Sequence, residues 1–259
     1  MELELYQLAI VLIGSTLAGS INTLAGNGSA ITLTILTELI GLPGNLANGT
    51  NRVGIFTQSA AGSYAFYRNG KLDLQRSRWP ILLTIAGAIA GVAVAVNVSN
   101  EAFRSVFRFL MVLMLLVILV KPKRWLRESD LERQPHPLVA IPLYLGLGFY
   151  GGFIQMGMGV FFLAVMVLYA RYSLVEANAV KGFVVGAYTF LVIFVFQWQG
   201  LISWPVGLLM AVGQTTGGYF TAHYAARYPQ ANVWAHRLLV AVVLLAIARL
   251  FDLHLLLGG

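Results

Sequence analysis

Long apolar runs alternate with short polar segments along the whole chain. A helix needs about 20 predominantly apolar residues to cross a bilayer, and each half of the sequence contains a series of apolar segments. The pattern predicts helical segments at 5–25, 29–41, 46–67, 79–98, 102–120, 138–156, 159–170, 175–198, 204–224 and 234–251. It therefore predicts an all-α, polytopic transmembrane helical bundle. Its parts are a first repeat at 1–120, a linker at 121–137 and a second repeat at 138–259.

The second apolar segment of each half is too short for an untilted crossing. Each follows a glycine-bracketed break, Ala25-Gly-Asn-Gly-Ser29 in the first half and Gly157-Met-Gly159 in the second. Glycine weakens a helix by about 1 kcal/mol relative to alanine, so each half is expected to open with a broken or re-entrant helical hairpin. Unwound backbone at membrane depth is tolerated where protein or a watery cavity faces it. Paired breaks in two halves are typical of a transporter's binding site.

A faint internal repeat relates the two halves. Ala47-Asn48 matches Ala177-Asn178, and Gly70 matches Gly200, both at a spacing of 130 residues. Trp79-Pro80 matches Trp204-Pro205 at a spacing of 125 residues. The ordered series of matches favours two copies of one helical unit.

The basic residues predict how the chain crosses the membrane. If the N-terminus lies outside and each half crosses an odd number of times, the inside segments are 68–78, 121–137, 171–175 and 225–237, which hold most of the Lys and Arg residues. The segments then expected outside hold none. This distribution follows the positive-inside rule and makes the second half enter from the opposite face, so the repeats are predicted to have inverted topology.

Composition excludes several classes of protein. Of the 259 residues, 58% are hydrophobic and only 10% are charged, whereas a soluble domain carries about 25% charged residues. The mean hydropathy is +0.77. The net charge of +7 comes from basic residues in short loops between apolar runs, which argues against nucleic acid as a partner.

The sequence offers no chemistry of catalysis. The chain has no cysteine and only four scattered histidines, so we predict no metal site and no cofactor. No hydrolase, metalloprotease or P-loop motif occurs, and we predict that the chain is not an enzyme. The acidic N-terminus lacks the pattern of a signal peptide.

The two breaks form the first candidate site. A helix that begins at such a break presents free backbone N–H groups and a positive dipole end, which together attract an anion. The candidate binding residues are Asn27, Gly28, Ser29, Gln155, Gly157 and Gly159. We expect Ser29 to cap the second helix, and we expect the glycines to leave space for the anion. The alternative is that the glycines permit close helix packing.

The second candidate site is a pair of polar clusters at the start of the third segment of each half. The candidate binding residues are Asn48, Thr50, Asn51 and Arg52 in the first half and Asn178 and Lys181 in the second. A cation inside an apolar span is costly and is a functional candidate. The alternative is that Arg52 and Lys181 extend to the headgroups and that the asparagines cap or bridge helices.

These residues resemble the sulfite exporter TauE/SafE family, also called the 4-toluene sulfonate uptake permease family. The resemblance rests on the glycine-rich break, on Ala47-Asn-Gly-Thr-Asn51, on Phe66-Tyr-Arg-Asn-Gly-Lys-Leu-Asp73, and on the second copy up to Gly200-Leu-Ile-Ser-Trp204. It implies secondary transport of a small sulfur-containing anion, such as sulfite, a sulfonate or sulfoacetate.

The resemblance also implies a multi-pass protein of a bacterial inner membrane, and the charge pattern places both termini outside the cytoplasm. The expected partners are a small anionic substrate and membrane lipid, while the coupling ion, a proton or sodium, and the formation of an oligomer are left undecided. The alternatives are a passive anion channel, a carrier of another small organic anion such as a carboxylate, a structural membrane subunit, and a cation-coupled carrier of neutral solutes.

Overall fold

The computed structural model describes residues 4–99 and 136–225, together with 101, 105, 106, 109, 112, 237 and 244. In the first half the helices are α1 (Leu5–Ala25), α2 (Gly28–Thr34), α3 (Gly44–Arg68) and α4 (Arg78–Ala95). In the second half they are α6 (Pro137–Phe153), α7 (Met158–Ala164), α8 (Leu174–Trp198) and α9 (Trp204–Ala225). Two π-helices, η1 (Ile35–Leu39) and η3 (Val165–Tyr169), extend α2 and α7. Within the described residues every regular element is a helix, which confirms the predicted all-α class.

Three of these helices, α1, α4 and α8, are long and apolar enough to cross a membrane. Helix α6 and the segments formed by α2 with η1 and by α7 with η3 are apolar but shorter. The observed bounds lie close to the predicted ones. The predicted helices at 102–120 and 234–251 and the linker at 121–137 lie outside the described residues apart from a few positions.

The two short segments differ from the prediction in their last turn. Both end in a π-helix, in which Ile40 N–H donates to the Ile35 carbonyl at 3.0 Å and Ala170 N–H donates to the Val165 carbonyl at 2.8 Å. A π turn has no simple local sequence signal, and such turns are often found at functional sites. The break followed by a short helix is therefore confirmed in each half, with a wider final turn than an α-helix has.

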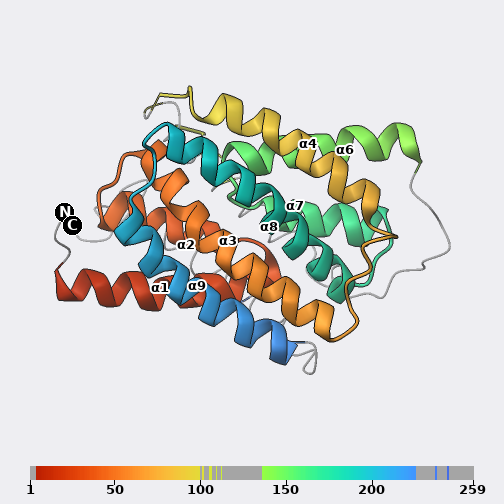
Figure 1. Cartoon of the computed structure of the whole chain (residues 1–259), viewed down its shortest axis with the longest axis horizontal. Helices are drawn as coiled ribbons and strands as arrows, with labels where there is room; N and C mark the ends of the chain where they lie inside the picture. Colours follow the sequence, from red (N-terminus) through yellow and green to blue (C-terminus); the bar gives the residue numbers. More distant parts are fainter. Residues whose placement is uncertain are drawn as a thin grey trace.

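The long helices pack mainly across the two halves. Helix α1 lies along α9, α4 lies along α6, and α3 lies along α8 (Figure 1). Glycines bring the backbones close: a Cβ at Gly91 would overlap the Phe149 carbonyl of α6, and a Cβ at Gly217 would overlap the Thr16 carbonyl of α1. Close packing through small residues is a common basis of helix association in membranes.

The elements recur in the same order and at matching lengths. Helices α2 and α7 each contain 7 residues, η1 and η3 each contain 5, and α3 and α8 each contain 25. In Figure 1 the corresponding helices of the two halves, α1 and α6, α3 and α8, α4 and α9, run in opposite directions. How they are oriented across a bilayer stays a prediction.

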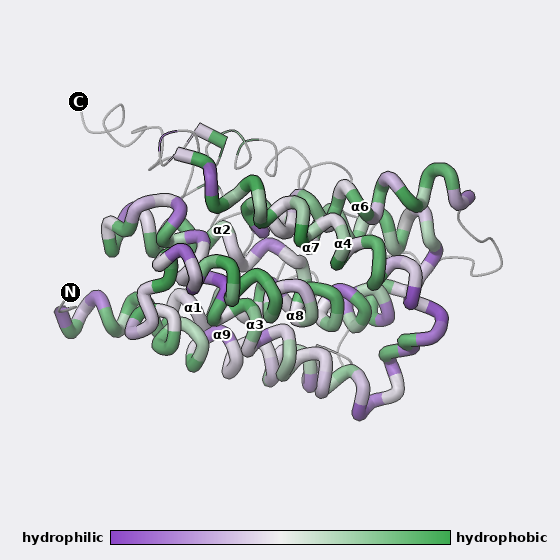
Figure 2. Tube along the Cα trace, turned by 45° about the horizontal axis from the view of Figure 1, so that its top comes forward, coloured by the Kyte–Doolittle hydropathy of each residue, from purple (hydrophilic) through white to green (hydrophobic). Residues whose placement is uncertain are grey.

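Helix α3 is the polar centre of this bundle. It is as long as α8, but it is less apolar and is not one of the three candidate membrane spans. Its buried residues include the asparagines of the second candidate site and Arg52, whose side chain is fully buried. Figure 2 shows hydrophobic residues along most of the helices and hydrophilic ones at the ends of the bundle and at a few positions inside it.

Candidate functional site

Both hairpins unwind where the glycines predict. Helix α1 ends at Ala25, and Gly26 adopts a left-handed conformation with φ of 78°. Helix α6 ends at Phe153, and Gln155 and Gly157 have φ values of 66° and 72°. A left-handed conformation suits glycine and is strained for a residue with a Cβ. The position of Gln155 is therefore enforced by its surroundings, which are described below.

The two breaks touch each other directly. A Cβ at Gly159 would overlap the backbone of Gly26, and a Cβ at Gly26 would overlap that of Gly159. Within the first hairpin, a Cβ at Gly28 would overlap the Ala18 carbonyl. The space that a Cβ would need at Gly28 and Gly159 is therefore occupied by backbone, so the glycines permit close packing here.

The first turn of α2 differs from the prediction. The N-cap is Asn27 and not Ser29, which is the second residue of the helix. Asn27 is fully buried, and neither its amide nitrogen nor its amide oxygen has a hydrogen-bond partner in the described structure. Ser29 is also buried, at 3% exposure. The predicted cap is thus wrong by two residues, because α2 begins immediately after the break.

Lys181 of α8 reaches across to the end of α1. Its ammonium donates to the Asn22 carbonyl at 2.7 Å and to the Thr23 carbonyl at 3.2 Å. It also donates to Oδ1 of Asn178, one turn earlier on α8, at 2.6 Å. An ammonium has three donors, so this side chain is fully bonded. The negative dipole end of α1 stabilises the cation further.

Arg52 of α3 does the same at the end of α6. Its Nη1 donates to the Gly151 carbonyl at 2.7 Å and to Oε1 of Gln155 at 2.8 Å. Its Nη2 donates to the Gly152 carbonyl at 2.9 Å and to Oδ1 of Asn48 at 3.2 Å. Nε has no hydrogen-bond partner in the described structure. The guanidinium is therefore held in a fixed orientation against the unwound end of the helix.

Asn48 and Asn178 also bond to the opposite half of the chain. Nδ2 of Asn48 donates to the Phe153 carbonyl at 2.9 Å, and Nδ2 of Asn178 donates to the Leu24 carbonyl at 3.4 Å. Each asparagine also accepts from the cation on its own helix. The end of each broken hairpin arm is thus bonded by one amide and one cation from the third α-helix of the opposite half, α3 or α8.

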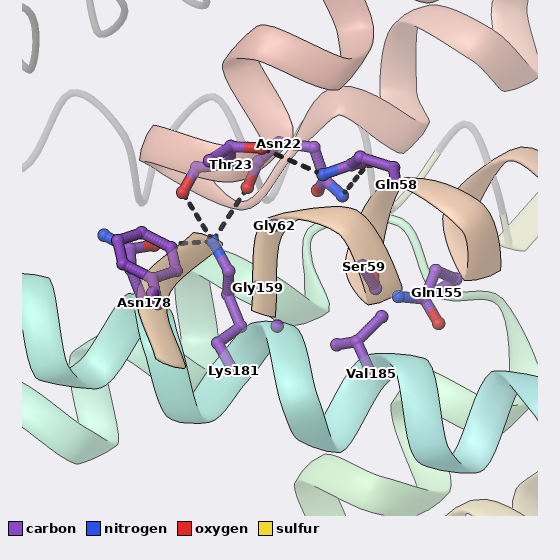
Figure 3. A pocket seen from close by; sticks show the side chains of 12 residues that line it. Asn22, Thr23, Gln58, Ser59, Gly62, Gln155, Gly159, Asn178, Lys181 and Val185 are labelled. Atoms are coloured by element: carbon purple, nitrogen blue, oxygen red, sulfur yellow. Dashed lines mark hydrogen bonds between the residues drawn. The ribbon is translucent and has the colours of Figure 1, made fainter. Parts of the chain in front are cut away.

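A small cavity lies between the breaks and α8, with Lys181 on its wall. Its volume is about 20 Å³, which suits a single water molecule. Figure 3 shows Lys181 directed towards the end of α1, with Asn178 beside it, and Ser59 and Gln155 on the other side. The lining residues are Asn22, Thr23, Gln58, Ser59, Gly62, Phe66, Gln155, Gly159, Asn178, Lys181, Gly182 and Val185.

The cavity brings together only some of the predicted residues. Gln155, Gly159, Asn178 and Lys181 line it. Arg52 connects to it through its bond to Gln155, whose Oε1 also accepts from the Tyr188 hydroxyl at 2.5 Å. These bonds hold the strained backbone of Gln155 in place.

Two predicted residues, Thr50 and Asn51, bond to α9 or to the residue directly before it. The Thr50 hydroxyl accepts from the Ser203 N–H at 2.9 Å, directly before α9. Oδ1 of Asn51 accepts from Nε2 of Gln214 at 3.4 Å, while its Nδ2 has no partner in the described structure. Thr50 therefore connects α3 to the residue before α9. Bridging between helices is the alternative role stated above for the asparagines.

Sequence reasoning missed Gln58 as a site residue. Its Oε1 accepts from Nδ2 of Asn22 at 3.0 Å, and its Nε2 donates to the Thr23 hydroxyl at 3.1 Å. These bonds fix the last turn of α1 next to Lys181. The sequence did contain a signal, since Gln58 is an amide in the middle of a predicted helix. The structure shows that it is buried. Tyr188 gave no such signal, because an aromatic residue in an apolar helix is ordinary.

Two basic side chains, Lys181 and Arg52, lie buried at the candidate site. The partners of Lys181 and Arg52 are all neutral oxygens, and no carboxylate of the described residues contacts either cation. Isolated buried charges are costly, and an opposite charge nearby offsets much of that cost. Neither basic side chain therefore has an opposite charge beside it among the described residues.

Comparison with known proteins gives a consistent result. The model of the family described as "Sulfite exporter TauE/SafE" matches residues 11–250. The chain is 28% identical over 257 residues to a probable membrane transporter protein, ORF9, of Sinorhizobium, covering 97% of this chain and 95% of that protein. It is 25% identical over 248 residues to the probable membrane transporter protein YfcA of Escherichia coli, covering 95% and 91%. A probable membrane transporter protein of Haemophilus influenzae is 28% identical over 221 residues, covering 84% of each chain. No solved structure matches the chain.

Proposed function

The chain is a membrane transporter of the sulfite exporter TauE/SafE family, and we propose that it is a secondary active carrier of a small sulfur-containing anion. The substrate class is a sulfite, a sulfonate or a compound like sulfoacetate. The family description supports sulfur chemistry, and the positive centre of the bundle supports an anion.

The observation that carries this proposal is the environment of Lys181. Its ammonium lies on the wall of a cavity that is otherwise lined by neutral polar and apolar groups. All of its bonding partners are neutral oxygens. An oxyanion that took the place of one of these oxygens would accept a charge-assisted hydrogen bond from this ammonium, and the amides of Asn22, Gln58 and Asn178 offer further donors.

The size of the cavity favours a carrier over a passive channel. A space for one water molecule is too small for a sulfur oxyanion, so the observed conformation is too narrow at this cavity to hold the proposed substrate. Binding then requires the hairpins to move apart, as in alternating access. The two breaks meet through the backbones of Gly26 and Gly159, with no side chain between them. They can therefore separate at this contact without breaking the packing of large side chains.

The arrangement of the helices supports the predicted inverted repeats. Corresponding helices run in opposite directions (Figure 1), and each hairpin arm is bonded by the opposite half. Together with the positive-inside pattern, this supports a multi-pass protein of a bacterial inner membrane with both termini outside the cytoplasm. Cysteines introduced at Ser99 and Ser129 are expected to label from opposite sides of the membrane, whereas labelling from one side would contradict this topology.

Reconstitution in liposomes tests the proposal. We expect saturable uptake of radiolabelled sulfite or sulfoacetate that responds to an imposed proton or sodium gradient. Sulfate, acetate and a neutral solute of similar size serve as comparisons. Flux that does not saturate and ignores every gradient would favour a channel, and equal uptake of acetate would move the substrate class to carboxylates.

A further inference from the structure

A second, larger hollow lies on the outside of the bundle, between α3 and α8. Its volume is about 630 Å³, within the range of about 300–1,000 Å³ that is usual for ligand sites. Its lining is almost entirely apolar and includes Phe56, Tyr64, Tyr67, Phe190 and Leu191. The last four of these side chains are exposed, between 42% and 62%. An open apolar groove of this kind is suited to the hydrocarbon of a bilayer.

The groove ends at the most basic part of the described structure. Tyr67 is followed by Arg68, and the lining residue Leu72 is preceded by Lys71. Arg68 lies four residues after Tyr64 and therefore on the same face of α3. Both cations are exposed, and neither makes an interaction with another described residue.

The other charged residues between α3 and the start of α4 either contact an aromatic ring or are acidic. Arg76 lies over the Tyr172 ring at 4.6 Å, and Arg78 lies over the Trp79 ring at 5.7 Å. The single acidic residue, Asp73, accepts from the Arg76 N–H at 3.0 Å. Two free cations thus remain at the mouth of the groove, on the side that the charge pattern predicts to be cytoplasmic.

The corresponding position in the second half lacks this charge. Helix α8 ends at Trp198, and the following turn carries Gln199 and Gly200 in place of basic residues. Among the residues that the structure describes, the combination of apolar groove and free cations therefore occurs at the end of α3 and not at the end of α8. This asymmetry matches a membrane whose cytoplasmic leaflet is rich in anionic lipid.

We propose that this groove binds an anionic phospholipid, with an acyl chain between α3 and α8 and the headgroup phosphate at Arg68 and Lys71. This binding is separate from substrate transport. The groove shares Ser59 and Gly182 with the central cavity, so these two residues form the thin wall between lipid and cavity. An acyl chain in the groove covers that wall on its lipid side and supports the closed conformation of the centre.

Native mass spectrometry of the delipidated protein tests the proposal, with dioleoyl phosphatidylglycerol and dioleoyl phosphatidylcholine as probes. A basic residue near an anionic surface raises binding about fivefold, so we expect at least about a tenfold preference for phosphatidylglycerol. The double variant Arg68→Gln, Lys71→Gln should lose this preference. The charge-preserving exchange Arg68→Lys, Lys71→Arg should retain it.

A second pair of variants tests the groove itself. Ala60 lines it from an exposed position, so Ala60→Trp should fill it and abolish the bound lipid. Ala90, exposed on α4 away from the groove, provides the control Ala90→Trp, which should bind lipid normally. Equal retention of both lipids by the unaltered protein, or unchanged phosphatidylglycerol binding in Ala60→Trp, would overturn the proposal. A dimer that Ala60→Trp dissociates, in a protein without bound lipid, would assign the groove to a second copy of the chain.

Discussion

The two buried cations occupy matching places and do different work. Each reaches from the third α-helix of one half to the unwound hairpin arm of the other, and each is hydrogen-bonded to an asparagine on its own helix. Arg52 makes four hydrogen bonds and does not line the cavity. Lys181 makes three and stands on the cavity wall. From this comparison we predict a supporting role for Arg52 and, under the proposed function, a direct contact with the substrate for Lys181.

The difference follows from the chemistry of the two side chains. A guanidinium presents five donors in a fixed plane and is suited to holding several acceptors at once. An ammonium is a compact charge on a flexible stem, and it exchanges partners more readily. A carrier needs both properties: one hairpin held firmly and one cation able to pass from backbone carbonyls to a ligand.

Replacement of Arg52 should give the largest effect. In Arg52→Gln the carbonyls of Gly151 and Gly152 lose charged donors at a buried position, at a cost of about 1–3 kcal/mol for each group left unsatisfied. We expect a strongly reduced yield of folded protein and a lower Tm in detergent. Arg52→Lys keeps the charge but loses at least one hydrogen bond, so its Tm should lie between those of Arg52→Gln and the unaltered protein. A Tm equal to that of the unaltered protein would place Arg52 with Lys181 as a substrate contact.

Replacement of Lys181 should affect binding more than folding. In Lys181→Gln the amide keeps donors for the Asn22 and Thr23 carbonyls but removes the charge. The lost charge-assisted bond is worth about 1.5–3 kcal/mol, so we expect anion affinity to fall roughly tenfold or more, measured by calorimetry with sulfite. Arg78→Gln, which removes an exposed cation at the start of α4, is the control and should bind normally. Equal losses in both variants would indicate a general effect of charge.

A pair of glycine variants separates packing from binding, and Gly62→Ala should show the smallest effect of all. Gly159→Ala places a Cβ against the backbone of Gly26 and should lower Tm. A Cβ at Gly62 meets no atom within 4 Å, and alanine favours a helix by about 1 kcal/mol, so Gly62→Ala should raise Tm slightly. Because Gly62 lines the cavity, its variant is also expected to weaken binding by narrowing the site. If Gly159→Ala were as stable as Gly62→Ala, the contact between the breaks would be looser than observed.

Much of the fold could be predicted from the sequence because its signals are local. The breaks follow from glycines inside apolar runs, and the shortness of the segments after them predicted the hairpins. The close spacing of Asn48 to Arg52 and of Asn178 to Lys181 marked both cations as unusual for an apolar span. These features depend on composition and periodicity, which the sequence displays directly.

The rest depended on which surfaces meet in three dimensions. Nothing near Arg52 in the sequence indicates that its partners are the carbonyls of Gly151 and Gly152, about a hundred residues away. The direct contact of Gly26 with Gly159 likewise depends on how the halves dock. The sequence predicted that both breaks were open to an anion, whereas the structure places backbone against backbone there and moves the open space towards Lys181.

The position of a bound anion tests the central claim most directly. Selenite has the shape and charge of sulfite, and its selenium atom is located by anomalous diffraction from crystals of the complex. We predict one selenium site within hydrogen-bond reach of the Lys181 ammonium, between the two hairpin breaks, and its loss in Lys181→Gln. A selenium site at the molecular surface, with the space beside Lys181 still closed, would contradict the account.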